Sequence, residues 1–102
     1  MARIGRSVND PPRKPRPYED APRLPAGPAV DARSLVAGEW LELEVGPGRG
    51  GFVFERLEVE PRCGVIGLEV RRKWASIVDL RIAKRGMNAR GRVLSRILLL
   101  RK

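Results

Sequence analysis

The fold of this chain is decided by residues 41–51, Leu-Glu-Leu-Glu-Val-Gly-Pro-Gly-Arg-Gly-Gly. The first half of this stretch alternates apolar and acidic side chains, which is the period of a β-strand. The second half carries glycine at positions 46, 48, 50 and 51. Glycine permits positive φ, sharp turns and the close approach of a ligand to backbone N–H groups. We therefore expect a strand that runs directly into a glycine-rich turn.

A helix should follow the turn, over about Gly51 to Glu60, because no helix breaker occurs before Pro61. We expect this helix to place Phe52, Phe54 and Leu57 against the sheet. A strand, a glycine turn and the N-terminus of a helix together form a nucleotide-type cofactor site.

Two classes of cofactor use such a turn. Gly46, Gly48 and Gly51 satisfy the Gly-x-Gly-x-x-Gly pattern of dinucleotide sites, and Glu69 follows Gly51 by 18 residues, near the position expected for a ribose-binding acid. Glu44 precedes the first glycine by two residues. Its carboxylate would repel a pyrophosphate but suits the sulfonium and ammonium groups of S-adenosylmethionine. We favour a methyl-donor site, and a dinucleotide site is the alternative.

A second strand is predicted at Val65–Val70, where an apolar run is bounded by breakers and is typical of a buried parallel strand. Glu69 lies at its carboxyl end, where a doubly wound fold places an acid that accepts both ribose hydroxyls of an adenosine. The alternative for Glu69 is a surface carboxylate paired with Arg71 or Arg72. For Glu44 the alternative is an acid at the edge of a strand.

A second helix is predicted over Lys73 to Lys84, with Gly86 as its C-terminal cap. Its apolar stripe consists of Trp74, Ile77, Val78 and Ile82. Branched apolar residues over 92–102 then predict a third strand. The expected fold is α/β: an incomplete Rossmann-like arrangement of about three parallel strands with two crossover helices.

A flexible arm is expected over residues 1–35, before a Rossmann-like part at 36–102. Seven of the nine prolines lie within residues 1–32. Proline removes a backbone donor and disfavours helix at the preceding residue, so we expect an extended, polyproline-like and poorly packed segment. Cations and an aromatic ring at residues 13–18 suggest a supplementary RNA contact. The alternative is a leader without a role.

Charge is unevenly distributed along this chain of 102 residues, whose net charge is +9. Residues 36–70 carry 3 basic and 7 acidic side chains, whereas residues 71–102 carry 11 basic and 1 acidic. Such a basic region favours a polyanionic partner, because neutralised phosphates release counterions. The alternative is the solvated face of a basic protein.

Cys63 is the single cysteine and the chain has no histidine, so the sequence predicts neither a disulfide nor a metal site. A lone cysteine is consistent with a reducing cytoplasm. No apolar run approaches the roughly 20 residues that span a bilayer, so no membrane segment is expected.

Two segments resemble a known family. They are residues 43–50, Leu-Glu-Val-Gly-Pro-Gly-Arg-Gly, and residues 65–73, Val-Ile-Gly-Leu-Glu-Val-Arg-Arg-Lys. Together they resemble the bacterial tRNA (guanine-N7-)-methyltransferases, whose second strand ends in a Gly-(Ile/Leu)-Glu signature. The continuation over 74–92 is similar too. The resemblance covers about Leu41 to Val93, and we expect this chain to be the amino-terminal, cofactor-binding half of such an enzyme, truncated or diverged after about Val93.

The resemblance implies an S-adenosylmethionine-dependent methyltransferase that modifies the variable-loop guanine of tRNA. Glu44, Gly46 and Gly48 would then shape the methionine end of the cofactor, and Glu69 would hold its ribose. The candidate tRNA contacts are Arg71, Arg72, Lys84 and Arg85. The rival interpretations are a fragment of a dinucleotide-binding oxidoreductase and a non-catalytic, basic RNA-binding protein.

Overall fold

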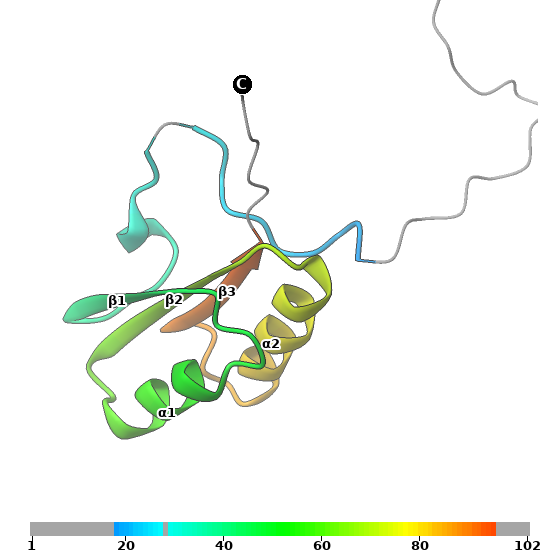
Figure 1. The fold of residues 1–102 in the computed structure, drawn as a ribbon. Helices are drawn as coiled ribbons and strands as arrows, with labels where there is room; N and C mark the ends of the chain where they lie inside the picture. Colours follow the sequence, from blue (N-terminus) through cyan, green and yellow to red (C-terminus); the bar gives the residue numbers. More distant parts are fainter. Residues whose placement is uncertain (1–17, 28, 96–102) are drawn as a thin grey trace, which may run out of the picture.

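The chain forms one parallel sheet with two helices (Figure 1). This computed structural model describes residues 18–27 and 29–95. The elements are a short 3₁₀ helix (Ala32–Ser34), β1 (Trp40–Val45), α1 (Gly51–Val59), β2 (Cys63–Glu69), α2 (Arg72–Lys84) and β3 (Gly91–Ser95). The strand order is β1-β2-β3, with both pairs parallel. The predicted incomplete Rossmann-like α/β fold is therefore confirmed.

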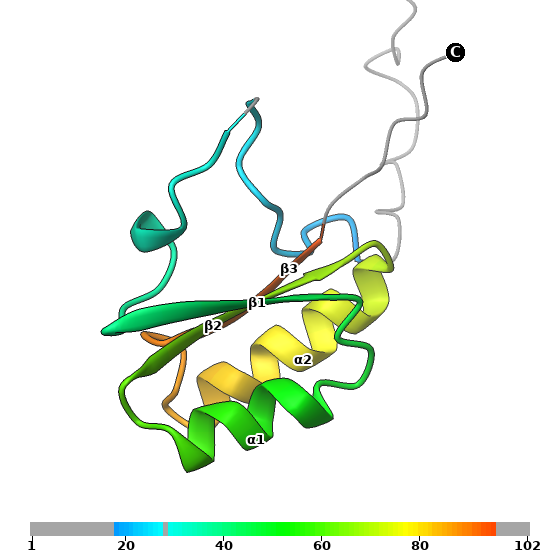
Figure 2. The same cartoon turned by 60° about the vertical axis from the view of Figure 1, so that its left-hand side comes forward.

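Helices α1 and α2 lie side by side on one face of the sheet (Figure 2). The core between the helices and the sheet consists of Val53, Leu57, Cys63, Val65, Ala75, Val78, Ile82 and Val93. The prediction that Phe52 packs against the sheet is wrong, because this side chain is 49% exposed. Val53 takes that place, since positions 53 and 57 lie one turn apart on the same face of α1.

The ends of the strands differ slightly from the prediction. Strand β2 begins at Cys63, two residues before the predicted start, and Cys63 is in register with Trp40 at the start of β1. Strand β3 begins at Gly91, in register with Val65. The remainder of the predicted third strand, residues 96–102, lies outside the described residues. Each parallel pair therefore ends at the same edge of the sheet, where Val45, Glu69 and Ser95 lie.

Part of the predicted arm runs along the sheet. The Ser95 N–H donates to the Pro22 carbonyl over 2.6 Å, and the Leu24 N–H donates to the Ser95 carbonyl over 3.0 Å. Ala21 is buried beside them. These residues of the expected arm are thus packed, whereas the predicted RNA contact at 13–18 lies outside the described residues except for Tyr18. The domain boundary at residue 35 stays a prediction.

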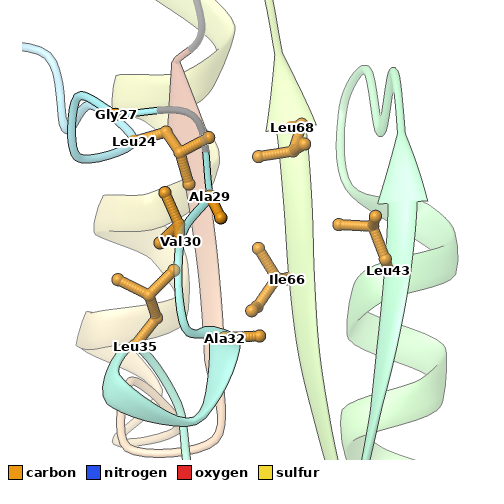
Figure 3. A pocket seen from close by; sticks show the side chains of 9 residues that line it. All are labelled: Leu24, Gly27, Ala29, Val30, Ala32, Leu35, Leu43, Ile66 and Leu68. Atoms are coloured by element: carbon orange, nitrogen blue, oxygen red, sulfur yellow. The ribbon is translucent and has the colours of Figure 1, made fainter.

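The face of the sheet opposite the helices is apolar (Figure 3). Side chains of the amino-terminal segment face β1 and β2 across a hollow of about 220 Å³. Its lining residues include Leu24, Val30, Leu35, Leu43, Ile66 and Leu68. Among the described residues this cover is partial, since Leu43 stays 63% exposed and Val45 78% exposed.

Candidate cofactor site

The glycine turn between β1 and α1 has the geometry that its sequence predicts. Gly46, Gly48 and Gly50 have φ values of +74°, +56° and +86°, a region that favours glycine. Space distinguishes them. A Cβ at Gly46 would meet no atom within 4 Å, and one at Gly48 would meet Arg71 Nη2 at 3.8 Å, whereas one at Gly50 would lie 2.6 Å from Val78 Cγ1. Gly46 and Gly48 are therefore open to a ligand, and Gly50 serves packing.

The turn is held against β2. The Gly46 N–H donates to the Leu68 carbonyl over 2.8 Å. Pro47 lies over Gly67, where a Cβ would come within 2.8 Å of Pro47 Cγ. Glycine at position 67 thus lets the turn fold closely over the carboxyl end of the sheet, which fixes the distance between the turn and Glu69.

Glu69 is buried at the end of β2, only 2% exposed. Its Oε1 accepts from Arg71 Nη2 over 2.9 Å, and its Oε2 accepts from the Arg71 N–H and Nε over 3.1 and 3.3 Å. The Arg71 guanidinium is the main cause that lowers the pKa of this carboxyl, with a smaller contribution from the Gly48 N–H. The pairing with Arg71 that the sequence offered as an alternative is present, but the carboxylate is buried. The ribose role of Glu69 stays a prediction.

Glu44 carries a buried oxygen, Oε2, that has no hydrogen-bond partner among the described residues. Burial raises the pKa of its carboxyl. Ser95 Oγ is likewise buried without a partner in that part of the chain, and Ser95 is in register with Glu69. Buried polar atoms in proteins nearly always have a partner, so both oxygens suit a polar ligand at this edge of the sheet. The open glycines and the acids therefore fit the methionine and ribose ends of S-adenosylmethionine.

Two of the four predicted RNA contacts lie at this site. Arg71 and Arg72 stand at the start of α2, beside the turn. A third cation lies there that was not predicted: the Arg49 guanidinium is 5.2 Å from the centre of the Trp74 ring. The position of Arg49 between two glycines of the turn was a signal that this cation lies at the site. Its contact with Trp74 was not predictable from the pattern, because the apolar stripe places Trp74 against the sheet.

The other two predicted RNA contacts, Lys84 and Arg85, lie at the far end of α2. A helix of 13 residues is about 20 Å long, so these side chains do not join the cations beside the turn. Arg85 also bonds Glu58 over 3.1 Å and lies over the Phe54 ring. The four residues therefore form two groups.

A second polar cluster, around Glu42, joins β1 to α1. Glu42 accepts two hydrogen bonds of 2.8 Å from Arg56 and one of 3.0 Å from Trp40 Nε1, and the Cys63 thiol lies 3.1 Å from its Oε2. These hydrogen bonds, Arg56 first, lower the pKa of Glu42 to about 2. Burial, followed by the contact with Glu42, raises the pKa of Cys63 to about 11. Because Arg56 pairs with both oxygens of Glu42, the role of this cluster is structural. The sequence pattern did not predict the cluster.

Within residues 18–27 and 29–95, no group of three or more acidic or cysteine side chains is arranged to hold a metal ion. The helices of the same part of the chain are too short or too polar to cross a membrane.

Comparison with known proteins gives one informative similarity. The chain is 39% identical over 57 residues to the tRNA (guanine-N(7)-)-methyltransferase of Anaeromyxobacter dehalogenans (strain 2CP-C). The similar region is 56% of this chain and 28% of that protein. No family model matches the chain. No solved structure matches it. The similarity supports a methyltransferase, and the chain matches about a quarter of its relative's length.

Proposed function

We propose that this chain is the S-adenosylmethionine-binding part of a cytoplasmic tRNA (guanine-N7-)-methyltransferase that modifies the variable-loop guanine. One observation carries the proposal: a turn with open, positive-φ glycines follows Glu44, whose oxygen lacks a partner among the described residues, and packs over the end of β2, where Glu69 is buried. The similarity to a tRNA methyltransferase over 57 residues gives this geometry its family context.

Each end of the cofactor has a candidate partner in this arrangement. Glu44 would pair with the positively charged methionine end, because that end supplies the cation and the N–H donors that the unpartnered oxygen needs. Gly46 and Gly48 would let the cofactor approach the backbone closely. Glu69 would accept the two ribose hydroxyls. A pyrophosphate, by contrast, would bring two negative charges toward Glu44 and Glu69.

The reaction requires little acid–base chemistry from the protein. S-adenosylmethionine supplies a methyl group on a positively charged sulfur, and guanine N7 already carries a lone pair. The transfer therefore needs alignment and electrostatic stabilisation more than a strong base, which suits a chain without histidine. Arg71 and Arg72 would help to position the phosphates of the tRNA, with Lys84 and Arg85 as a separate contact at the far end of α2.

The proposal is tested by calorimetric titration of the full chain with S-adenosylmethionine, S-adenosylhomocysteine and a nicotinamide dinucleotide. The first two ligands should bind and the third should not. Glu69→Gln should weaken binding about tenfold or more, since a charge-assisted acceptor is lost. Glu55→Gln, an exposed acid on α1, is the matched control and should bind as the unmodified chain does. Transfer of a labelled methyl group to a tRNA transcript then tests catalysis separately.

The rival functions give different results in the same experiment. A fragment of an oxidoreductase would bind the nicotinamide dinucleotide and lose it on substitution of Glu69. A non-catalytic RNA-binding protein would bind none of the three ligands, and its affinity for tRNA would survive both Glu44→Ala and Glu69→Ala.

A further inference from the structure

Arg71 occupies the place that the proposed cofactor would need. Its guanidinium holds both oxygens of Glu69, and its Nη2 is the atom that a Cβ at Gly48 would meet, at 3.8 Å. The side chain therefore lies over the glycine turn and on the ribose acceptor at once. It can leave that place, because 59% of its surface is exposed, whereas the Glu69 side chain is only 3% exposed.

The acceptor sites on Glu69 are already filled. A carboxylate accepts about four hydrogen bonds. The Arg71 side chain supplies two of them, the Arg71 N–H supplies a third, and the Gly48 N–H interacts with the same group. A ribose diol needs two acceptor sites, and the two backbone groups are held in place by the glycine turn and by the start of α2. The guanidinium is thus the partner that a ribose would replace.

The displaced guanidinium would join a basic surface. Arg72 and Lys73 follow it directly at the start of α2, a helix with no acidic residue in its first turn, and Arg49 lies over Trp74 nearby. While Arg71 is paired, Glu69 neutralises its charge. When two neutral hydroxyls take its place on Glu69, the surface gains a free cation suited to a phosphate.

We infer that Arg71 is an exchangeable latch: a ribose bound at Glu69 releases the guanidinium to an RNA phosphate, so that cofactor and tRNA bind cooperatively. This inference rests on the proposed function and adds cooperativity to it, because the loaded site binds RNA more tightly than the empty one. Linkage requires the reverse effect to be equal, so tRNA must tighten cofactor binding by the same factor.

The experiment measures S-adenosylhomocysteine affinity with and without a tRNA transcript, and tRNA affinity with and without S-adenosylhomocysteine, on the full chain. In the unmodified protein each ligand should tighten the other about fivefold. Arg71→Gln should bind S-adenosylhomocysteine about threefold to tenfold more tightly, because the competing ion pair is gone. In that variant tRNA and S-adenosylhomocysteine should no longer affect each other. Circular dichroism checks that each variant folds.

Two further variants keep the test decisive. Arg81→Gln removes an exposed cation from the same helix and should keep both the affinity for S-adenosylhomocysteine and the cooperativity. Arg71→Lys keeps the charge but cannot bind both oxygens of Glu69 as a planar fork. It should bind S-adenosylhomocysteine more tightly while retaining part of the cooperativity, and it replaces Arg71→Gln if that variant does not fold.

The outcomes separate this inference from the proposed function. If the unmodified chain binds S-adenosylhomocysteine and neither Arg71 variant binds it more tightly, the latch is overturned and the proposed function stands. Cooperativity that survives in Arg71→Gln overturns the latch as well. If Arg71→Gln binds S-adenosylhomocysteine and the unmodified chain does not, the latch is supported. If no folded variant binds S-adenosylhomocysteine, both the latch and the proposed function fail.

Discussion

Arg56 on α1 and Glu42 on β1 are joined by two parallel hydrogen bonds of 2.8 Å, from Nε and from Nη2. The pair ties the first helix to the first strand on the side of the sheet that faces the helices. Glu42 and Glu44 lie on the same face of β1, because alternate residues of a strand point the same way. Both oxygens of Glu42 are paired, whereas Glu44 keeps one oxygen without a partner in the described part of the chain.

Glu42 should make the stability of the fold depend on acidity. Its pKa is lowered from 4.5 to about 2 in the folded chain, so its contribution is fully present above pH 4.5 and is lost as the pH falls toward 2. Thermal melts between pH 7 and pH 2 should show this loss, and Glu42→Gln should lower the melting temperature by several degrees at pH 7. A variant that melts at the same temperature as the unmodified chain at neutral pH would contradict the structural role of the pair.

Glu44 should have the opposite effect on stability. Burial raises its pKa, so its ionised form destabilises the fold above about pH 4.5 and the penalty disappears on protonation. Glu44→Gln should therefore stabilise the chain at neutral pH, which thermal melts measure as a higher melting temperature than that of the unmodified chain.

The same substitution tests whether Glu44 belongs to the site. Glu44→Gln should weaken S-adenosylmethionine about tenfold, because the cationic end of that ligand loses its charged acceptor. A stabilised variant with unchanged affinity would remove Glu44 from the site and leave it as an acid at a strand edge. Loss of stability together with affinity would contradict the unpartnered state of Oε2.

Cys63 should report on the integrity of the sheet. The side chain is fully buried, and the pKa of its thiol is raised to about 11, so almost none of it is thiolate at pH 8. Reaction with an aromatic disulfide reagent should be at least about a hundredfold slower in the folded chain than in denaturant, since two pKa units alone change the thiolate fraction by that factor. Cys63→Ser is the blank. Equal rates in the two states would mean that β2 is not buried.

Ligand should slow this reaction further. Anything that binds the folded state stabilises it, so saturating S-adenosylhomocysteine should protect Cys63 from labelling through rare unfolding. The cysteine is the only one in the chain, so the signal has a single origin. Protection by a nicotinamide dinucleotide instead would favour the dinucleotide alternative.

The sequence predicted elements more successfully than contacts. Alternation over residues 41–45 and the glycine spacing gave β1 and its turn correctly, because period and backbone freedom are local properties. The prediction for Phe52 was wrong because it relied on the size of the side chain and not on its position around the helix. The smaller Val53 lies one turn from Leu57 and is buried with it. The partners of Glu69 were only partly predictable: proximity named Arg71, but the degree of burial depends on how the turn folds over Gly67.

Hydrogen bonds between residues far apart in the sequence could not be predicted from the hydrophobic pattern. Asp79 on α2 accepts from Arg92 Nε over 2.8 Å and from the Val93 N–H over 2.9 Å, so it binds both a side chain and the backbone of β3. Position 79 lies 13 and 14 residues before these partners, and no periodic signal joins a helical acid to a strand that follows it. Such contacts appear only when tertiary packing sets the distance between α2 and β3.

Asp79→Ala should therefore destabilise the chain by about 2 kcal/mol or more, since a partly buried Arg92 and a backbone donor lose their partner together. Denaturant titration measures the change. Asp79→Asn is the informative companion, because it can still accept from the Val93 N–H and should recover part of the loss. If both variants are as stable as the unmodified chain, the bond between α2 and β3 contributes nothing to the fold.

Gly46 and Gly50 should respond differently to the same added methyl group, although both have positive φ. At Gly50 the methyl would lie 2.6 Å from Val78 Cγ1, so Gly50→Ala combines backbone strain with overpacking and should cost about 3 kcal/mol. At Gly46 no atom lies within 4 Å of the new methyl, so Gly46→Ala should cost only about 1 kcal/mol of strain.

The space left open at Gly46 is the space that a ligand would use, so Gly46→Ala should lose more than tenfold in affinity for S-adenosylhomocysteine. Denaturant titration and calorimetry on both variants measure the two effects separately. If Gly46→Ala keeps its affinity, the turn does not contact the ligand, and the glycine at position 46 is there for backbone conformation alone.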